Sequence, residues 1–336
     1  MTRLTLALAL AILAVACGRE PHGPPDGGHP DAGPDAGPVG PRDDGTLSLA
    51  TWNMEFFGDT TQGPADDALQ QRNVTAILAD AGFGIAGLEE VVDVARFNAV
   101  VAALPGYDAV LSSDGARVSG TSSCVSFGGS PCYGDFEQKL GLLYRTSVAS
   151  FRSAQLILTG DATTEYNFGY RPPLRVDLDL RTGDGGTDPL VVIVVHLKAY
   201  ADTASLARRQ ASSVALKGYL DSALPTQKVA VVGDWNDDLD HSTAGTAYPS
   251  PFQNFLNDPA RYQFVTSVLT EANIGTHTFG STIDHQLVTN ELLPQLRAGS
   301  VTVVHPESWG DPGYSPQSAY SSTTSDHWPV VSRWER

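Results

Sequence analysis

Positively charged residues are scarce in this sequence. Its 336 residues include 21 Lys plus Arg against 38 Asp plus Glu, which gives a formal net charge of −17. A protein that binds nucleic acid non-specifically through a basic surface would show the opposite balance. The composition therefore excludes that class, and we expect any phosphate group to be bound at one local site with the help of cations.

Long hydrophobic segments are absent beyond the N-terminus. An apolar run at residues 4–15 follows Arg3 and ends in small residues before Cys17, which is typical of an export signal. The run is shorter than the roughly 20 apolar residues that cross a bilayer. We expect residues 1–16 to be a signal peptide, and the sequence around Cys17 resembles a bacterial lipoprotein box with an imperfect upstream position.

Cysteine is rare, with only three residues in the chain. Cys124 and Cys132 flank a short loop and can pair in an oxidising compartment. This pairing would leave Cys17 alone at the mature N-terminus as a lipid anchor. We expect an exported protein, either an outer-membrane lipoprotein of a bacterial cell envelope or a secreted protein, with a lipid as its one membrane contact. The alternatives are an unlipidated Cys17 and two free thiols in the loop.

Large apolar side chains are almost missing from residues 17–45. Residues 18–45 contain 8 Gly and 7 Pro, with a repeated Pro-Asp-Ala-Gly unit. Such a segment cannot bury enough surface to fold, so we expect a disordered tether. The remaining residues, 46–336, keep 18 basic and 32 acidic side chains, so most of the acidity (a formal charge of −14) belongs to the domain.

Residues 46–336 alternate short apolar runs with amphipathic segments and show no repeat, which predicts one α/β domain. The first strand is not followed by Gly-x-Gly-x-x-Gly, so two packed sheets with outer helices are favoured over a dinucleotide-binding sheet. Helices are predicted at 66–81, 94–103 and 204–223, the last with Leu206 and Val214 on its apolar face. Strands are predicted at 46–52, 83–88, 107–111, 140–145, 148–158, 174–180, 190–195, 228–232, 284–289, 301–305 and 329–334.

Polar side chains interrupt the apolar runs where predicted strands begin or end. Because strand ends deliver their residues to one edge of a sheet, we expect these side chains to meet. Each one alone also fits a turn, a solvated charge or a buried-edge imidazole. The residues are Asn53, Glu89, Glu90, His196, Asp234, Asn236, Asp284, His285, Asp326 and His327.

The ordered set of motifs resembles the endonuclease/exonuclease/phosphatase superfamily. It comprises Thr-Trp-Asn, Leu-Glu-Glu-Val, Val-His-Leu-Lys, Gly-Asp-Trp-Asn, Ile-Asp-His and Ser-Asp-His-Trp-Pro-Val, and it spans residues 47–334. The resemblance implies a four-layered sandwich of two mainly antiparallel β-sheets flanked by helices, as in deoxyribonuclease I. It also implies a hydrolase of phosphoester bonds.

The resemblance assigns a metal-binding role to three residues, Asn53, Glu90 and Asp326. Mg²⁺ prefers oxygen ligands and is held by one or two carboxylates plus substrate phosphate, and Mn²⁺ and Ca²⁺ are alternatives. Glu89 stands where the family commonly has Gln, and the register Leu-x-Glu-Val favours Glu90 as the ligand. Glu55 varies within the superfamily and is left out of the ligand set.

The resemblance assigns catalytic roles to Asp284 and His327 as a carboxylate–imidazole pair, to Asp234 at the attacking water, and to Asn236 and His196 as donors to the phosphate. The proton acceptor is either Asp234 or His327. Arg171 is a weaker candidate for a phosphate contact. For Arg208 and Arg209 a solvated helix face is favoured.

The sequence predicts a Mg²⁺-dependent phosphoesterase outside the cytoplasm, with a nuclease acting on DNA or RNA as the favoured function. The alternatives are a phosphoesterase of phospholipids or inositol phosphates, similar to sphingomyelinase, and a non-catalytic surface binding protein. No exposed aromatic or apolar hairpin for lipid insertion is evident between the motifs, which favours the nuclease. Nothing indicates a protein partner, and we expect a monomer.

Overall fold

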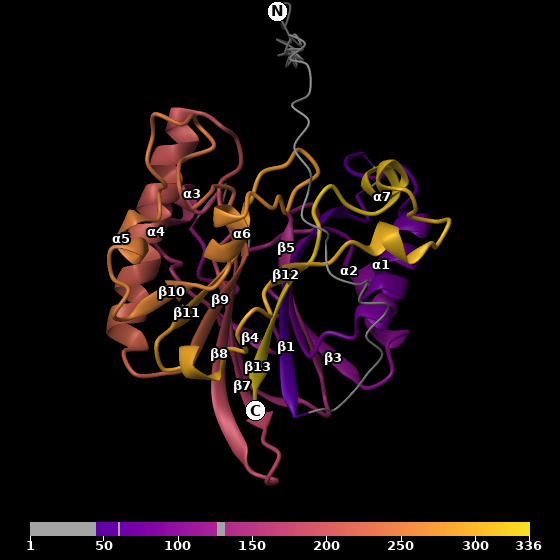
Figure 1. The fold of residues 1–336 in the computed structure, drawn as a ribbon, viewed down its shortest axis with the longest axis horizontal. Coiled ribbons are helices and arrows are strands. Elements are labelled where there is room, and N and C mark those ends of the chain that lie inside the picture. The colour runs from indigo at the N-terminus through magenta and orange to yellow at the C-terminus, as the bar shows by residue number, and fades with distance from the viewer. Residues whose placement is uncertain (1–44, 60, 126–131) are drawn as a thin grey trace, which may run out of the picture. The chain divides into compact units, whose positions relative to one another are not determined.

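A computed structural model describes residues 45–59, 61–125 and 132–336 (Figure 1). The predicted signal peptide and nearly all of the predicted tether lie outside these residues. The first strand begins at Thr46, where the sequence predicted the folded domain to begin. No helix within the described residues is both long and apolar enough to cross a membrane.

Two β-sheets form the centre of the fold. The six-stranded sheet has the spatial order β12 (Thr302–Val303), β13 (Val330–Glu335), β1 (Thr46–Phe57), β2 (Ile85–Val91), β5 (Lys139–Arg145), β3 (Tyr107–Leu111). The seven-stranded sheet has the order β10 (Tyr262–Phe264), β11 (Asp284–Thr289), β9 (Val229–Asp234), β8 (Thr187–His196), β7 (Leu174–Arg181), β6 (Ala149–Leu156), β4 (Val118–Ser119). Most neighbouring strands are antiparallel. The parallel pairs are β1 with β2, β8 with β9 and β4 with β6.

Helices cover the outer face of each sheet, as Figure 1 shows. The six-stranded sheet carries α1 (Asp67–Ala81) and α2 (Val94–Ala102), with α7 (Gln317–Thr323) beside α1. The seven-stranded sheet carries α4 (Thr203–Ala223) and the short helices α3 (Ala162–Asn167), α5 (Gln253–Leu256) and α6 (Ser267–Glu271). Two 3₁₀ turns lie at Leu293–Gln295 and Pro306–Trp309. The predicted four-layered sandwich is confirmed.

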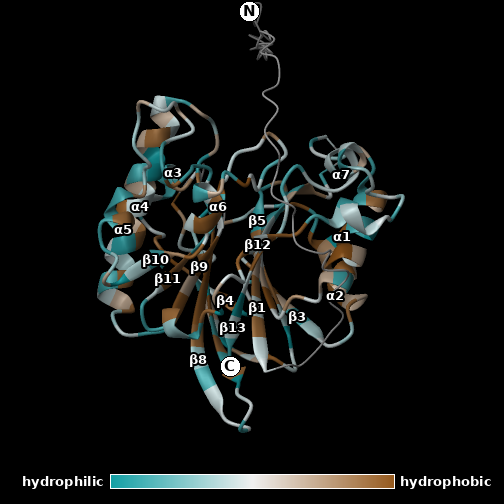
Figure 2. Cartoon of the chain, in the orientation of Figure 1, coloured by the Kyte–Doolittle hydropathy of each residue, from teal (hydrophilic) through white to brown (hydrophobic). Residues whose placement is uncertain are grey.

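The buried apolar side chains form three layers, one between the two sheets and one on the outer face of each sheet. The alternation of side chains along the strands explains them. Leu49 and Val192 point between the sheets, whereas their neighbours Ala50 and Ile193 point outward beneath α1 and α4. This alternation is the period of two that a strand imposes on its side chains. Figure 2 shows the result as hydrophobic strands inside hydrophilic outer helix faces.

Several sequence predictions need correction. The first strand extends to Phe57, so Asn53 lies within a strand and not at its end. Val214 of α4 is 64% exposed, because the buried stripe of this helix is partly polar and includes Arg209 and Ser212. The strands β4 and β10 and the helices α3, α5, α6 and α7 were missed because segments of two to seven residues carry too little periodicity.

The predicted disulfide is present. Cys124 and Cys132 are bonded, with 5.3 Å between their Cα atoms. Both residues are buried and belong to the layer between the sheets. The bond therefore ties the ends of the loop between them to the core.

Close contact between the sheets depends on Gly87 of β2. A Cβ atom at this position would lie 2.6 Å from Val232 Cγ2 of β9, so we expect Gly87→Ala to lower the free energy of unfolding by about 1–3 kcal/mol. A Cβ atom on Gly218 of α4 would instead have open space around it, with nothing within 4 Å. Gly218→Ala should therefore raise stability by about 1 kcal/mol, because Ala is the better helix former. Urea unfolding of the two variants checks the opposite signs, and equal shifts would contradict this packing.

Candidate active site

The strand register brings the polar side chains to one end of both sheets. In the six-stranded sheet Asn53 of β1 pairs with Glu89 of β2. Asp326 and His327 lie just before β13, whose first residue, Val330, pairs with Thr51 of β1. In the seven-stranded sheet Asp234 lies between His196 and Asp284 on the neighbouring strands. Asn53 bonded to Asp234 and His327 bonded to Asp284 connect the two sets of side chains across the sheets.

Glu90 is held in place by a strained segment of backbone. Its φ is 62°, and Glu55 and Phe56 on the neighbouring strand both have φ of 46°. These irregularities coincide with shifts in the pairing of β1 with β2. They place the Phe56 N–H 2.8 Å from Glu90 Oε2. Non-glycine residues with positive φ persist only where the surroundings fix them, and they concentrate at functional sites.

Glu89 and Glu90 point in different directions. Glu89 is fully buried and accepts a hydrogen bond from Thr51 Oγ1 at 3.0 Å. Burial, with repulsion from Asp284 and Asp234, raises the pKa of Glu89 well above its usual value, which favours the neutral form of its carboxyl. A neutral carboxyl can replace the amide of the family's Gln. Glu90 contacts Asn53 and His196 and is the glutamate of the site.

Asp234 is the acceptor at the centre of the site. Its Oδ2 accepts from Asn53 Nδ2 and Asn236 Nδ2, both at 3.0 Å, and its Oδ1 accepts from the Asn236 N–H at 2.8 Å. Asn53 Nδ2 also donates to Glu90 Oε1 at 3.2 Å, so this amide links two carboxylates. Burial and the nearby Asp284 raise the pKa of Asp234 to about 7, although His327 opposes the shift.

His196 is a buried neutral imidazole. Its Nε2 lies 3.5 Å from Asp234 Oδ2 and 3.6 Å from Glu90 Oε1. Burial and the positive charges of Arg171 and His327 lower the pKa of His196 well below its usual value. Its Nδ1 has no hydrogen-bond partner in the described part of the chain. Arg171 does not point at a phosphate position here, because its guanidinium donates to the carbonyl oxygens of His196 and Leu197.

Asp284 and His327 form the predicted carboxylate–imidazole pair. His327 Nδ1 lies 2.9 Å from Asp284 Oδ2, and Thr276 Oγ1 donates to the same oxygen at 2.6 Å. Burial alone would lower the pKa of His327, but Asp284, Asp234 and Asp326 together raise it well above its usual value. His327 Nε2 faces Asp234 Oδ2 at 3.9 Å and Asp326 Oδ1 at 3.8 Å.

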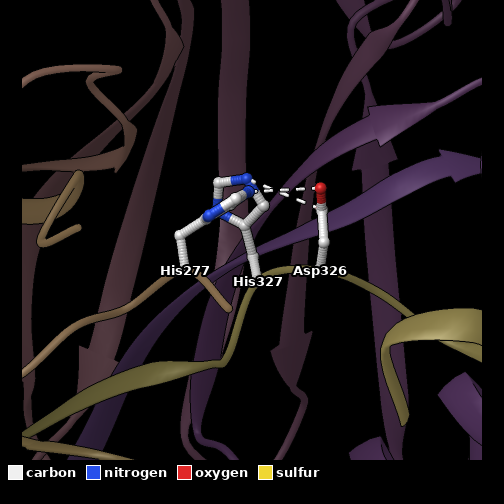
Figure 3. A group of neighbouring side chains, drawn as sticks. All are labelled: His277, Asp326 and His327. Atoms are coloured by element: carbon white, nitrogen blue, oxygen red, sulfur yellow. Dashed lines mark hydrogen bonds and ion pairs between the residues drawn. The ribbon is translucent and has the colours of Figure 1, made fainter. Parts of the chain in front are cut away.

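His277 joins the site from the loop before β11, and no motif predicted it. Its Nε2 lies 3.2 Å from Asp326 Oδ2, and its ring packs edge-on against His327 with centroids 4.6 Å apart. Figure 3 shows both imidazoles directed at the Asp326 carboxylate. Burial would raise the pKa of Asp326, but the hydrogen bond from His277 and the charge of His327 lower it.

Glu55 completes a carboxylate group with Glu90 and Asp326. Burial and repulsion from Asp326 and Glu90 raise the pKa of Glu55 to about 7. Its Oε2 is buried without a hydrogen-bond partner among the described residues. Several carboxylates close together, one of them with an oxygen that has no hydrogen-bond partner, supply the oxygen ligands that Mg²⁺ and Mn²⁺ prefer. The predicted ligands Glu90 and Asp326 would hold the cation with Glu55 near them. Among the described residues, the groups of three whose ligand atoms lie within 4.8 Å of one another are His277, Asp326 and His327, and Asp234, Asp284 and His327. Asn53, predicted as a ligand, donates to Glu90 through Nδ2, and its Oδ1 accepts a hydrogen bond from the Glu55 N–H.

All eight predicted site residues lie in one connected network of hydrogen bonds and ion pairs. The sequence missed His277 and Thr276, because they lie in a loop without periodicity. Their only signal is the polar segment before Ile283 and Asp284. Glu55 could have been found from its spacing, two residues after Asn53. Arg209 is wholly buried and bonded to Asp237 at 2.8 Å, so the solvated helix face expected for it is wrong.

The raised pKa values predict how a cation stabilises this protein. Between pH 4.5 and 7 the native state holds more protons on Glu55 than the unfolded state does, so metal-free stability falls as pH rises through this window. Cation binding needs the deprotonated carboxylates. We expect saturating Mg²⁺ or Mn²⁺ to raise the melting temperature by about 5 °C at pH 8 and much less at pH 5.5.

Thermal unfolding with the cation or with EDTA measures this increment. Glu55→Gln should reduce the pH dependence of the cation-induced rise in melting temperature. Glu335→Gln should not change this dependence, because Glu335 is a surface residue at the opposite end of β1. An increment that is the same at both pH values in the unsubstituted protein would contradict the carboxylate site.

Solved structures share this fold at low sequence identity. A D. rerio TDP2 humanized by 14 mutations matches 87% of this chain and 100% of its own, with 14% identity and a TM-score of 0.55. An endonuclease/exonuclease/phosphatase from Bacteroides vulgatus covers 86% of this chain and 98% of its own, with 14% identity and a TM-score of 0.56. The human Nocturnin catalytic domain covers 86% and 92%, with 13% identity and a TM-score of 0.54.

The sequence itself matches one family model. No curated protein matches it. The model of the endonuclease/exonuclease/phosphatase family matches residues 50–327, which include every residue of the site described above. Because this match spans most of the chain, the protein belongs to the endonuclease/exonuclease/phosphatase family, whose members are metal-dependent hydrolases of phosphoester bonds.

Proposed function

We propose that this protein is a Mg²⁺-dependent phosphodiesterase that cleaves nucleic acid outside the cytoplasm. The observation that carries the proposal is the joining of Glu90, Asp326, Asp234 and the Asp284–His327 pair at one end of two sheets in a member of this family. A D. rerio TDP2 of the same fold has been solved with a single-strand DNA product, which supports a nucleic-acid substrate.

The charges of the site suit an in-line attack of water on a phosphodiester. When bound, the divalent cation neutralises phosphate oxygens and lowers the pKa of bound water. Asp234, with a pKa of about 7, can accept the proton of the attacking water. His327 is kept protonated by Asp284 and can donate to a phosphate oxygen through Nε2. His196 and Asn236 lie beside Asp234 as further polar groups around the phosphate.

The two adjacent glutamates provide a matched test. Glu90→Gln removes a charge from the cation site, so kcat on plasmid DNA or bis-p-nitrophenyl phosphate should fall by at least 10²-fold, the order of magnitude that such groups contribute. Glu89→Gln replaces one neutral side chain with another of similar shape, so its activity should stay within a few-fold. The kcat of His327→Gln should fall by a similar factor to that of Glu90→Gln.

Steady-state kinetics with Mg²⁺ and with EDTA measure these effects, and circular dichroism confirms that the variants fold. Full turnover by Glu90→Gln in EDTA would refute the proposal. An absence of Mg²⁺-dependent turnover on every phosphoester would support a non-catalytic binding protein.

A lipid phosphoester is the second candidate substrate, and exposed aromatic side chains favour it. The sequence showed no aromatic or apolar hairpin for lipid insertion between the motifs, but three single aromatic side chains there are exposed: Phe136, Tyr200 and Phe279 are 90%, 73% and 87% exposed. Phe279 packs beside His277 of the site, with ring centroids 4.9 Å apart. Turnover of DNA, RNA, sphingomyelin and inositol phosphates, compared in one Mg²⁺-containing assay, separates the candidates. Faster turnover of sphingomyelin than of DNA would exclude the nuclease.

We further propose that Cys17 carries a lipid and that residues 18–45 tether the domain to an outer membrane. The motif around Cys17 and the Gly/Pro-rich composition support this location. In a bacterial host we expect the protein in the membrane fraction, and Cys17→Ser should move it to the soluble fraction of the envelope or the medium. Fractionation with immunoblotting measures this, and unchanged membrane association would refute the anchor.

A further inference from the structure

Two exposed tyrosine rings beside the active site each contact the positively charged side chain of a Lys or an Arg. Lys198 Nζ lies 4.0 Å from the centre of the Tyr200 ring, and Arg208 Cζ lies 3.8 Å from the centre of the Tyr166 ring. Tyr200 is 73% exposed and Tyr166 is 45% exposed. Lys198 follows the active-site residue His196 by two positions. We call Tyr166, Lys198, Tyr200 and Arg208 the Tyr200 surface.

The cations of this surface lack carboxylate partners, in contrast to many elsewhere in the chain. Surface cations such as Arg117, Lys217 and Lys228 each pair with an aspartate. In the described part of the chain, Lys198 and Arg208 form no ion pair. Arg208 Nη2 donates to the carbonyl oxygen of Tyr166, whereas Arg208 Nε is buried without a hydrogen-bond partner. Burial and the positive charges of Arg208 and Arg171 lower the pKa of Lys198 to about 8, although the nearby Asp202 opposes the shift. Unpaired like charges in an acidic domain suit an anionic ligand.

A buried arginine fixes the backbone of this surface to the catalytic loop. Arg209 is fully buried, and its Nη1 donates to the carbonyl oxygens of Lys198 and Tyr200 at 2.7 and 2.9 Å. Its Nε donates to Asp237 at 2.8 Å, three residues after Asp234. The loop that carries Tyr200 is therefore tied to the segment that carries the catalytic carboxylate.

Tyr200 is held in an unfavourable conformation while its ring faces solvent. Its φ is 83°, in the left-handed region that favours glycine. An exposed side chain gains little from burial, so packing of the ring does not explain the strain. The Tyr200 Cα lies at most about 15 Å along the chain from that of His196, within reach of a nucleotide next to the reacting phosphate.

We propose that the Tyr200 surface binds a single-stranded segment of nucleic acid, with one base stacked on Tyr200 and phosphates contacting Lys198 and Arg208. This inference rests on the proposed nuclease function and names the form of its substrate. An aromatic ring beside cations is the usual means of holding a single strand without reading its sequence. Lys198 occupies one face of the Tyr200 ring, and the ring's exposure leaves room for a base.

The test is binding of a fluorescent single-stranded oligonucleotide, measured by anisotropy with Mg²⁺ in a His327→Gln background that prevents cleavage. Tyr200→Ala should weaken binding by roughly 5- to 150-fold, the loss of one stacked base, and Tyr200→Phe should restore it. An abasic oligomer of the same length should bind the parent as weakly as the normal oligomer binds Tyr200→Ala.

The dependence of affinity on salt separates the cations from the ring. Lys198→Gln and Arg208→Gln should each reduce the slope of log K against log salt by about 0.7, one phosphate contact on a single strand. Arg297→Gln removes an exposed cation that pairs with Glu335 at the opposite end of the sheet and should leave the slope unchanged. Tyr200→Phe should also leave the slope unchanged.

The outcomes distinguish this inference from the function on which it rests. Unchanged binding by Tyr200→Ala, or equal binding of normal and abasic oligomers, would overturn it. Failure of the parent to bind the oligomer would overturn it too, even if the unsubstituted enzyme hydrolyses bis-p-nitrophenyl phosphate. Conversely, Tyr200-dependent binding without any phosphodiester turnover would support the surface and refute the enzyme.

Discussion

Repulsion between carboxylates at one end of the two sheets is the constraint on which the rest of the site depends. Burial, together with repulsion from Asp326 and Glu90, raises the pKa of Glu55 to about 7, and burial together with repulsion from Asp284 raises that of Asp234 to about 7. Such a group is unfavourable unless protons or a cation neutralise it. The fold maintains it through strand pairing, the hydrogen bonds of Asn53, and strained backbone at Glu90.

The strand register supplies the precision that this arrangement needs. His196, Asp234 and Asp284 are neighbours on three paired strands, so their relative positions are set by backbone hydrogen bonds and not by loops. Glycine permits the close approach, since a Cβ atom on Gly233 would lie 1.9 Å from the Val195 carbonyl oxygen. The close pairing of β8 with β9 therefore also positions His196 and Asp234 in the site.

The sequence predicted what depends on periodicity and on strand order. Apolar runs gave the main strands, and the polar residues at their ends gave the network from Asn53 to His327. Elements that depend on tertiary contacts were not predictable in this way. His277 reaches Asp326 from an irregular loop, and Arg209 is buried because Asp237, far along the chain, compensates its charge. The apolar face assigned to α4 failed for the same reason, since a polar stripe can be buried where partners satisfy it.

The positions of the positively charged side chains show where this acidic domain could attract an anion. A domain with a formal charge of −14 repels a polyanion at long range, so attraction has to arise locally. Many surface cations are neutralised by aspartates, whereas Lys198, Arg208 and Arg171 remain without ion pairs among the described residues and cluster near His196. A bound divalent cation would add to that local positive charge at Glu90 and Asp326. Under the proposed function, this local positive charge would attract a phosphodiester to the region beside His196.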